Sequence, residues 1–276
     1  MIRCDDRATL LAFCERDPIR YRHIIHELAS PCPEWDTAMR SFYGSSAQSS
    51  AFFVDSLADS SLIAHLRGRE LRLEGQAKGA AAGDLASWCR GLSPGLITTT
   101  HKPIRSCLAQ IIGEHEWALA RQYTAHAGSF RPKVGQTVRM LRPEDRPTWE
   151  RFVARHADEP MVVPGKGGSG AGVRDFEFMC SGMPADCYAA EEGGELIGFI
   201  SVNPMTRGCD EVSAMYVSPD HRRRGVGSAL LSAGTRDILA RERLPGYFAG
   251  EAGGDVDAML RGVGYELVSS VWTVRL

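Results

Sequence analysis

The segment Met215–Ser228 has the residue types and spacing of an anion-binding site. A β-rich run ends at Val217, and the three arginines Arg222–Arg224 follow it. Gly225 and Gly227 then stand where a helical pattern begins. The first amides of a helix have no internal acceptor and lie at the positive end of the helix dipole, and glycine lets an anion approach them. The segment therefore predicts a site for an anion such as a pyrophosphate, with forked donors from the arginines beside it.

Gly227 also has an explanation in packing alone. One set of small and apolar residues recurs at the spacing of a single helix face: Gly227, Leu230, Leu231, Gly234 and Ile238. Two glycines on that face would let the helix lie close to a sheet. Because packing explains neither the arginines nor the preceding strand, the anion site is the favoured interpretation.

The elements around this segment alternate between strands and helices. Periodicity and turn signals predict a strand at 137–141, a helix at 146–156, a hairpin of strands 187–191 and 196–202, a strand at 211–217, a helix at 225–242, a strand at 247–251, a helix at 255–261 and a strand at 265–276. An antiparallel meander followed by a βαβ unit predicts an α+β fold.

The first half of the chain has a similar mixture of elements and no catalytic spacing. Its pattern predicts helices within 8–28, broken at Asp17-Pro18, and at 83–92 and 103–112, with strands at 50–55, 61–66 and 96–100. The turn residues of Gly128–Pro132 indicate a linker. We therefore expect two domains, at residues 1–133 and 134–276.

Composition excludes several classes of protein. The chain has 276 residues, of which 43% are hydrophobic and 24% charged, and this excludes a disordered or fibrous protein. A net charge of -2 indicates neither a nucleic-acid nor a membrane partner. The acidic N-terminus lacks the apolar core of a signal peptide, and the eight cysteines form no Cys-x-x-Cys pair. We expect a cytoplasmic protein with reduced thiols.

A metal site is not expected. One group of possible ligands stands near the N-terminus: Cys4, Cys14, His23, His26 and Cys32. These residues lack zinc-finger spacing, so we interpret them as packed or exposed side chains.

The motif Arg222-x-x-Gly225-x-Gly227, after a strand ending in Tyr216-Val217, resembles the acyl-CoA-binding signature of the GNAT family of N-acetyltransferases. That signature is Gln/Arg-x-x-Gly-x-Gly/Ala at a strand-to-helix junction. The resemblance covers residues 136–276, and the first half resembles the degenerate N-terminal repeat of tandem members. It implies the GNAT fold, a mixed and mostly antiparallel central sheet flanked by helices, in two domains in tandem.

The resemblance also implies how acetyl-CoA binds as the acyl donor. The backbone of Met215, Tyr216 and Val217 would pair with the pantetheine arm like an added strand. The pyrophosphate would be held by Arg222 and by the amides of Arg223, Arg224, Gly225, Val226, Gly227 and Ser228. The strands 211–217 and 247–251 would part around the thioester. A primary amine of a small molecule or peptide then attacks directly in a ternary complex, with the protein a monomer or a homodimer.

The base that accepts the amine proton has three candidates. Glu211, six residues before Val217, stands where many family members carry this base, and Asp210 and Glu251 are rivals. The alternative interpretation of Glu211 is a solvated carboxylate near a strand end, with no role in catalysis.

The acid that protonates the leaving thiolate is less clear. The family often has a tyrosine four residues before the Gly of the closing pair, here Gly264-Tyr265, and this position is Leu260. The Asn usual earlier in that segment is replaced by Gly253. Two interpretations stay open: an N-acetyltransferase in which water, Tyr247 or Tyr265 supplies the proton, and a non-catalytic CoA-binding or regulatory module.

Overall fold

The computed structural model describes residues 1–30, 50–56, 62–75, 81–100, 102–113, 115–159, 186–250 and 254–276. The chain divides into two compact units. Unit 1 comprises Met1–Gln122, Ala249–Ala252 and Leu267–Leu276, and unit 2 comprises Tyr123–Phe248 and Gly253–Glu266. The last strand of the chain thus lies in the same unit as the N-terminal half. That residues 1–133 and 134–276 fold as separate domains stays a prediction.

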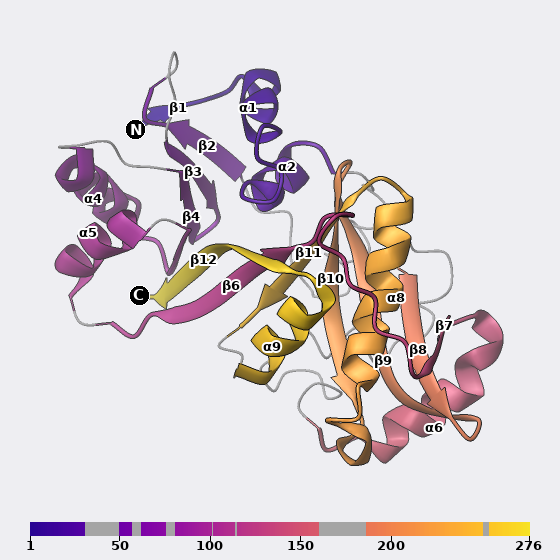
Figure 1. The fold of residues 1–276 in the computed structure, drawn as a ribbon. Helices are drawn as coiled ribbons and strands as arrows, with labels where there is room; N and C mark the ends of the chain where they lie inside the picture. The colour runs from indigo at the N-terminus through magenta and orange to yellow at the C-terminus, as the bar shows by residue number, and fades with distance from the viewer. Residues whose placement is uncertain are drawn as a thin grey trace. The chain divides into compact units, whose positions relative to one another are not determined.

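Unit 1 is a sheet with helices on both faces (Figure 1). Its elements are β1 (Ile2–Arg3), α1 (Arg7–Cys14), α2 (Arg22–Leu28), β2 (Ser50–Val54), β3 (Leu62–Arg67), β4 (Glu70–Gly75), α4 (Ala81–Leu92), β5 (Leu96–Thr99), α5 (Lys102–Ile112) and β12 (Glu266–Arg275). Strands β1 to β4 pair antiparallel, and β5 pairs in parallel with β4 and antiparallel with β12. β6 (Ala118–Thr124) leads the chain into unit 2.

The alternation of side chains along β3 explains the two layers of helices in unit 1. Leu62 and Ala64 lie in a core with residues of α4 and α5, whereas Ile63 lies in a second core with residues of α1 and α2. Successive side chains of a strand point to opposite faces, so one apolar strand supplies both cores.

Unit 2 contains the meander and the βαβ unit that the sequence predicts. Its elements are β7 (Thr137–Met140), the 3-10 turn η1 (Pro143–Asp145), α6 (Arg146–Arg155), β8 (Asp186–Glu192), β9 (Glu195–Thr206), β10 (Cys209–Val217), η2 (Pro219–His221), α8 (Val226–Ala240), β11 (Leu244–Ala249) and α9 (Gly254–Val263). Strands β7 to β10 pair antiparallel, and β11 pairs with β10 in parallel.

The two faces of the unit 2 sheet carry different helices. Trp149 and Phe152 of α6 make edge-to-face ring contacts with Phe199, whose centroid lies 5.2 and 6.1 Å away. On the other face, a Cβ placed on Gly234 of α8 would lie 3.1 Å from Val202 Cγ2. The glycine therefore lets α8 approach the sheet closely, as its helix-face pattern predicts.

The predicted α+β class is confirmed, but three strands were not predicted. β1 has only two residues, and β4 and β6 mix apolar with charged or polar residues, so their pattern is weak. The strand predicted at 247–251 begins too late, since β11 begins at Leu244. Glu251 and Gly253, which the sequence analysis names, lie outside the described residues.

Candidate functional site

The junction between β10 and α8 has the geometry of an anion site. Gly225 is the N-cap of α8 and has left-handed backbone angles, φ 82° and ψ 0°, and it offers no capping side chain. Ala229 donates its amide to the Gly225 carbonyl at 3.0 Å. The amides of the three residues between them, Val226 to Ser228, have no acceptor within the helix because they belong to its first turn. They are therefore available to an anion at the positive end of the dipole.

The two glycines of the motif have different surroundings. A Cβ on Gly225 would meet no atom within 4 Å, so this glycine is required by its positive φ. A Cβ on Gly227 would lie 3.1 Å from Met259 Sδ and 3.5 Å from Met215 Sδ. Packing thus accounts for part of the need for Gly227, as the alternative explanation proposed.

The base of the turn is anchored by a buried hydrogen bond. Ser218, directly after β10, shares a hydrogen bond of 2.9 Å between its Oγ and His156 Nε2 at the end of α6. Its amide donates to the Ile197 carbonyl at 2.9 Å. Burial lowers the pKa of His156, so the ring is neutral at neutral pH. These bonds hold the start of the turn to the sheet and to α6.

The side chain of Arg222 is half exposed, and its guanidinium turns back to contact the protein. Its Nε donates to the Val217 carbonyl at 3.0 Å, and its guanidinium lies 5.7 Å from the centre of the Tyr216 ring. A third contact joins its terminal nitrogen to Glu159 Oε2 at 3.6 Å. In this arrangement the side chain of Arg222 braces the turn.

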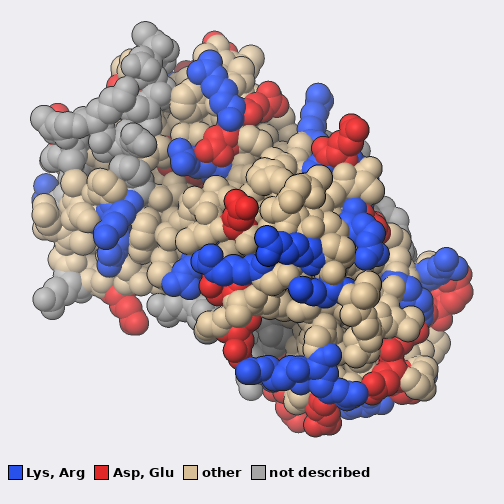
Figure 2. Space-filling view, viewed as in Figure 1, with Lys and Arg blue, Asp and Glu red and all other residues tan. Residues whose placement is uncertain are grey.

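The other two arginines form exposed ion pairs. Arg223 contacts Asp255 at 2.7 Å, and Arg224 contacts Glu192 at 3.0 Å. Figure 2 shows such neighbouring basic and acidic side chains over the lower part of the view, where Figure 1 places the start of α8. Exposed pairs of this kind contribute about 0–1 kcal/mol each, so an arriving anion could replace these carboxylates at little cost.

Strands β10 and β11 separate where the resemblance implies that they part. They pair in parallel over four positions, from Cys209 opposite Leu244 to Val212 opposite Tyr247. β10 continues to Val217 along β9 on its other side. From Ser213 onward, the edge of β10 that faces away from β9 thus has no ladder partner in β11, and it offers backbone groups to an extended ligand.

The candidate bases have different environments. Asp210 is 2% exposed and contacts Arg243 at 2.5 Å, and Arg243 also donates to the Cys209 carbonyl at 3.2 Å. This carboxylate therefore stabilises the β9–β10 connection. Glu211 is half-buried and lies opposite Asn203 of β9, just before the strands separate.

The candidate acids also differ. Tyr265 is buried and shares a hydrogen bond of 2.8 Å with Thr235 of α8, and burial raises its pKa. Tyr247 stands at the last paired position of β11, and burial raises its pKa to about 12. Leu260 is fully buried in α9. Tyr247 is therefore the tyrosine closest in register to the point of separation.

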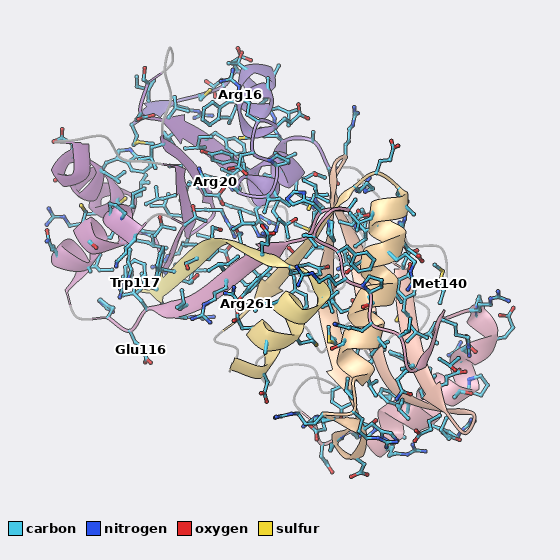
Figure 3. The ribbon with its side chains drawn as sticks, viewed as in Figure 1. Arg16, Arg20, Glu116, Trp117, Met140 and Arg261 are labelled. Atoms are coloured by element: carbon cyan, nitrogen blue, oxygen red, sulfur yellow. The ribbon has the colours of Figure 1, made fainter. Side chains whose placement is uncertain are left out.

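Two groups of polar side chains were not predicted from the sequence. A hydrogen-bonded row joins Asn203 and Ser201 of β9 to Ser213 of β10, and only the strand register brings them together. In the second group, Tyr123 of β6 donates to Asp257 of α9 at 2.6 Å. Asp257 also pairs with Arg261 at 2.8 Å, and Figure 3 shows Arg261 on α9.

Within the described residues, no group of three or more His, Cys, Asp or Glu side chains is arranged to hold a metal ion. Cys32 of the N-terminal group lies outside those residues. No helix in the described part of the chain is long and apolar enough to cross a membrane.

Residues 149–250 match the model of the acetyltransferase (GNAT) family. Among solved structures, the chain is similar to a Drosophila protein, with 18% identity over 99% of this chain and 97% of the other and a TM-score of 0.62. A GNAT-family acetyltransferase from Colwellia psychrerythraea has 8% identity over 99% and 98%, with a TM-score of 0.57. A tandem GNAT protein from the clavulanic acid biosynthesis pathway has 16% identity over 99% and 97%, with a TM-score of 0.51. No curated protein matches the sequence. The predicted fold, a GNAT fold in tandem, is confirmed.

Proposed function

We propose that the chain, whose residues 149–250 match the model of the GNAT acetyltransferase family, is an acyl-CoA-dependent N-acyltransferase that transfers acetyl from acetyl-CoA to a primary amine. One observation carries this proposal. The strand that separates from its parallel neighbour after Val212 also leads into a helix without a capping side chain, at Gly225. An extended pantetheine arm and a pyrophosphate need these two features at this spacing.

The acyl donor would lie along β10 and across the start of α8. The backbone of Met215, Tyr216 and Val217 would pair with the pantetheine amides. The amides of Arg223 to Ser228 would surround the pyrophosphate, and the side chains of Arg223 and Arg224 would exchange their carboxylates for it. Arg222 would act by bracing the turn, because its guanidinium already contacts the Val217 carbonyl and Glu159.

The reaction would need one proton acceptor and one proton donor. Glu211 would take a proton from the acceptor ammonium, and the amine nitrogen would then form a bond to the thioester carbon. A backbone amide at the separated part of β10 would stabilise the oxyanion. The C–S bond would break, the nitrogen would lose its second proton to water, and the CoA thiolate would take a proton from water or from Tyr247. Glu211 would return its proton to solvent. The products are an N-acetyl amide and CoA.

The competing function is a non-catalytic CoA-binding or regulatory module. It is favoured by Leu260, which is fully buried and cannot donate a proton where the family often has a tyrosine. A thiol has a pKa of about 8.5, so its thiolate is a tolerable leaving group even without a tyrosine. The two functions are separated by measuring the release of CoA thiol from acetyl-CoA in the presence of a panel of primary amines. A binding module would bind acetyl-CoA but form no free CoA thiol.

We also propose a cytoplasmic location, because the six described cysteines are all free thiols. The acceptor is proposed to be a small-molecule or peptide amine, and the protein a monomer or a homodimer, without a nucleic-acid or membrane partner.

Substitution of Gly225 tests the pyrophosphate site. In Gly225→Val, a β-branched residue at φ 82° is strained by roughly 1–2 kcal/mol, so the turn must change its shape and the amides lose their common direction. We expect the affinity for CoA, measured by titration calorimetry, to fall more than tenfold, which is about 1.4 kcal/mol or more.

The matched control is Gly113→Val, since Gly113 has φ 77° and equally open space around its Cβ but lies after α5 in unit 1. It should lose a similar amount of stability and keep wild-type affinity for CoA. Unchanged affinity in folded Gly225→Val would remove the pyrophosphate assignment.

A further inference from the structure

A row of polar side chains lies on one face of β9 and β10 in unit 2. Phe199, Ser201 and Asn203 alternate along β9, so all three point to the face that α6 covers at Phe199. Asn203 lies opposite Glu211 in the register. The face is thus apolar beneath α6 and becomes polar further along the strands, near the last positions at which β10 pairs with β11.

A β-bulge adds Ser213 to this row. Val212 lies opposite Val202 and Ala214 opposite Ser201, so Ser213 is an extra residue in β10. In a regular strand, Ser213 and the core residue Tyr216 are three positions apart and would point to opposite faces. The extra residue of the bulge places both side chains on the same face. The bulge lets one face hold the apolar packing of Tyr216 and the polar row, and it lies at the first position past the pairing with β11.

Hydrogen bonds within the row orient Asn203. Its Nδ2 donates to Ser213 Oγ at 2.8 Å, and Ser213 Oγ and Ser201 Oγ share a second bond of 2.8 Å. The Asn203 carbonyl oxygen takes part in none of the side-chain hydrogen bonds between described residues. Because the amide nitrogen is committed to Ser213, the carbonyl oxygen is an acceptor of fixed direction across from the Glu211 carboxylate.

We propose that Asn203, held by Ser213 and Ser201, is a positioning residue of the acceptor subsite and recognises a primary amine together with Glu211. The proposal rests on the proposed acyltransferase function. An ammonium group has three N–H donors, and this pair offers it two acceptors of different kinds. After Glu211 takes one proton, a remaining N–H stays bonded to the Asn203 oxygen. This contact holds the amine both before and after the proton transfer, so it contributes to amine binding in both states.

Two substitutions test the row without touching the CoA site. Ser213→Ala removes the acceptor that orients Asn203, so KM for the amine should rise about tenfold, while KM for acetyl-CoA and kcat at saturating amine should stay within about twofold. Asn203→Asp places a second carboxylate opposite Glu211. Like charges raise each other's pKa, so the acidic limb of the pH profile of kcat/KM should move up by about one unit.

The matched control is Thr273→Val, which removes a cross-strand hydroxyl pair of the same kind, Thr98 with Thr273 at 3.3 Å, in unit 1. It should change neither the amine KM nor the pH profile.

The amines tested as acceptors are spermidine, an aminoglycoside, free lysine and a peptide N-terminus. Thermal unfolding confirms that each variant is folded. Suppose that the wild type transfers acetyl, that Ser213→Ala has an unchanged amine KM and that Asn203→Asp has an unchanged pH profile of kcat/KM. This result would overturn the inference about Asn203 and leave the proposed function standing. If the wild-type protein binds acetyl-CoA but transfers acetyl to none of these amines, the proposed function is overturned as well.

Discussion

Glu211→Gln is expected to lower kcat about 100-fold at pH 7 and to leave the affinity for acetyl-CoA within about twofold of wild type. The glutamine keeps the size of the side chain and its place opposite Asn203, but it cannot accept a proton. A primary amine with a pKa near 10 is almost fully protonated at pH 7, so the reaction needs this acceptor. At pH 10 about half of the amine is already free, and the loss should shrink to less than about tenfold.

Asp210→Asn is the informative comparison, because Asp210 is the neighbouring carboxylate. It is 2% exposed and bonded to Arg243, so the substitution leaves a partly buried guanidinium without its charged partner. We expect a lower thermal unfolding midpoint and a pH profile of the same shape as wild type. Wild-type kcat at pH 7 in Glu211→Gln would transfer the role of base to Glu251, Asp210 or a water.

Gly264→Ala is expected to destabilise unit 2 by about 3 kcal/mol. Gly264 follows α9 with φ 99°, and a Cβ on it would lie 1.9 Å from the carbonyl oxygen of Ser129. The two segments are tied at this point, since Ser129 Oγ donates to the Gly264 carbonyl at 2.8 Å and Arg131 donates its amide to the Val263 carbonyl at 2.8 Å. The alanine must therefore both adopt a strained backbone and displace the segment after β6.

Gly262→Ala, two residues earlier, provides the control. Gly262 lies inside α9, and a Cβ there would meet no atom within 4 Å. Alanine is favoured over glycine in a helix interior by about 1 kcal/mol, so this variant should be as stable as wild type or slightly more so. Chemical denaturation followed by circular dichroism compares the two. Equal stability of both variants would contradict the close approach at Gly264.

The local features of the segment Met215–Ser228 could be predicted because they depend on neighbouring residues. A strand ending at Val217 and a helix beginning near Gly225 follow from β propensity and the spacing of apolar residues. The exact partners of the arginines could not be predicted. The side chain of Arg222 turns back to Val217 and Glu159 because the turn brings those groups within its reach, and the motif alone contains no sign of this.

The sequence by itself determined the fold class, the strand-to-helix junction between Val217 and Val226 and the place of Glu211 on β10, since these depend on patterns within about fifteen residues. Tertiary structure decided what depends on register and on distant segments. It brings Asp210 into an ion pair with Arg243. It also places a β-bulge at Ser213, and Ser213 thereby forms a hydrogen bond with Asn203. It also grouped β12 with unit 1 through pairing with β5. A one-residue change of register reverses which face a strand side chain occupies, and the register is set by contacts between strands far apart in the chain.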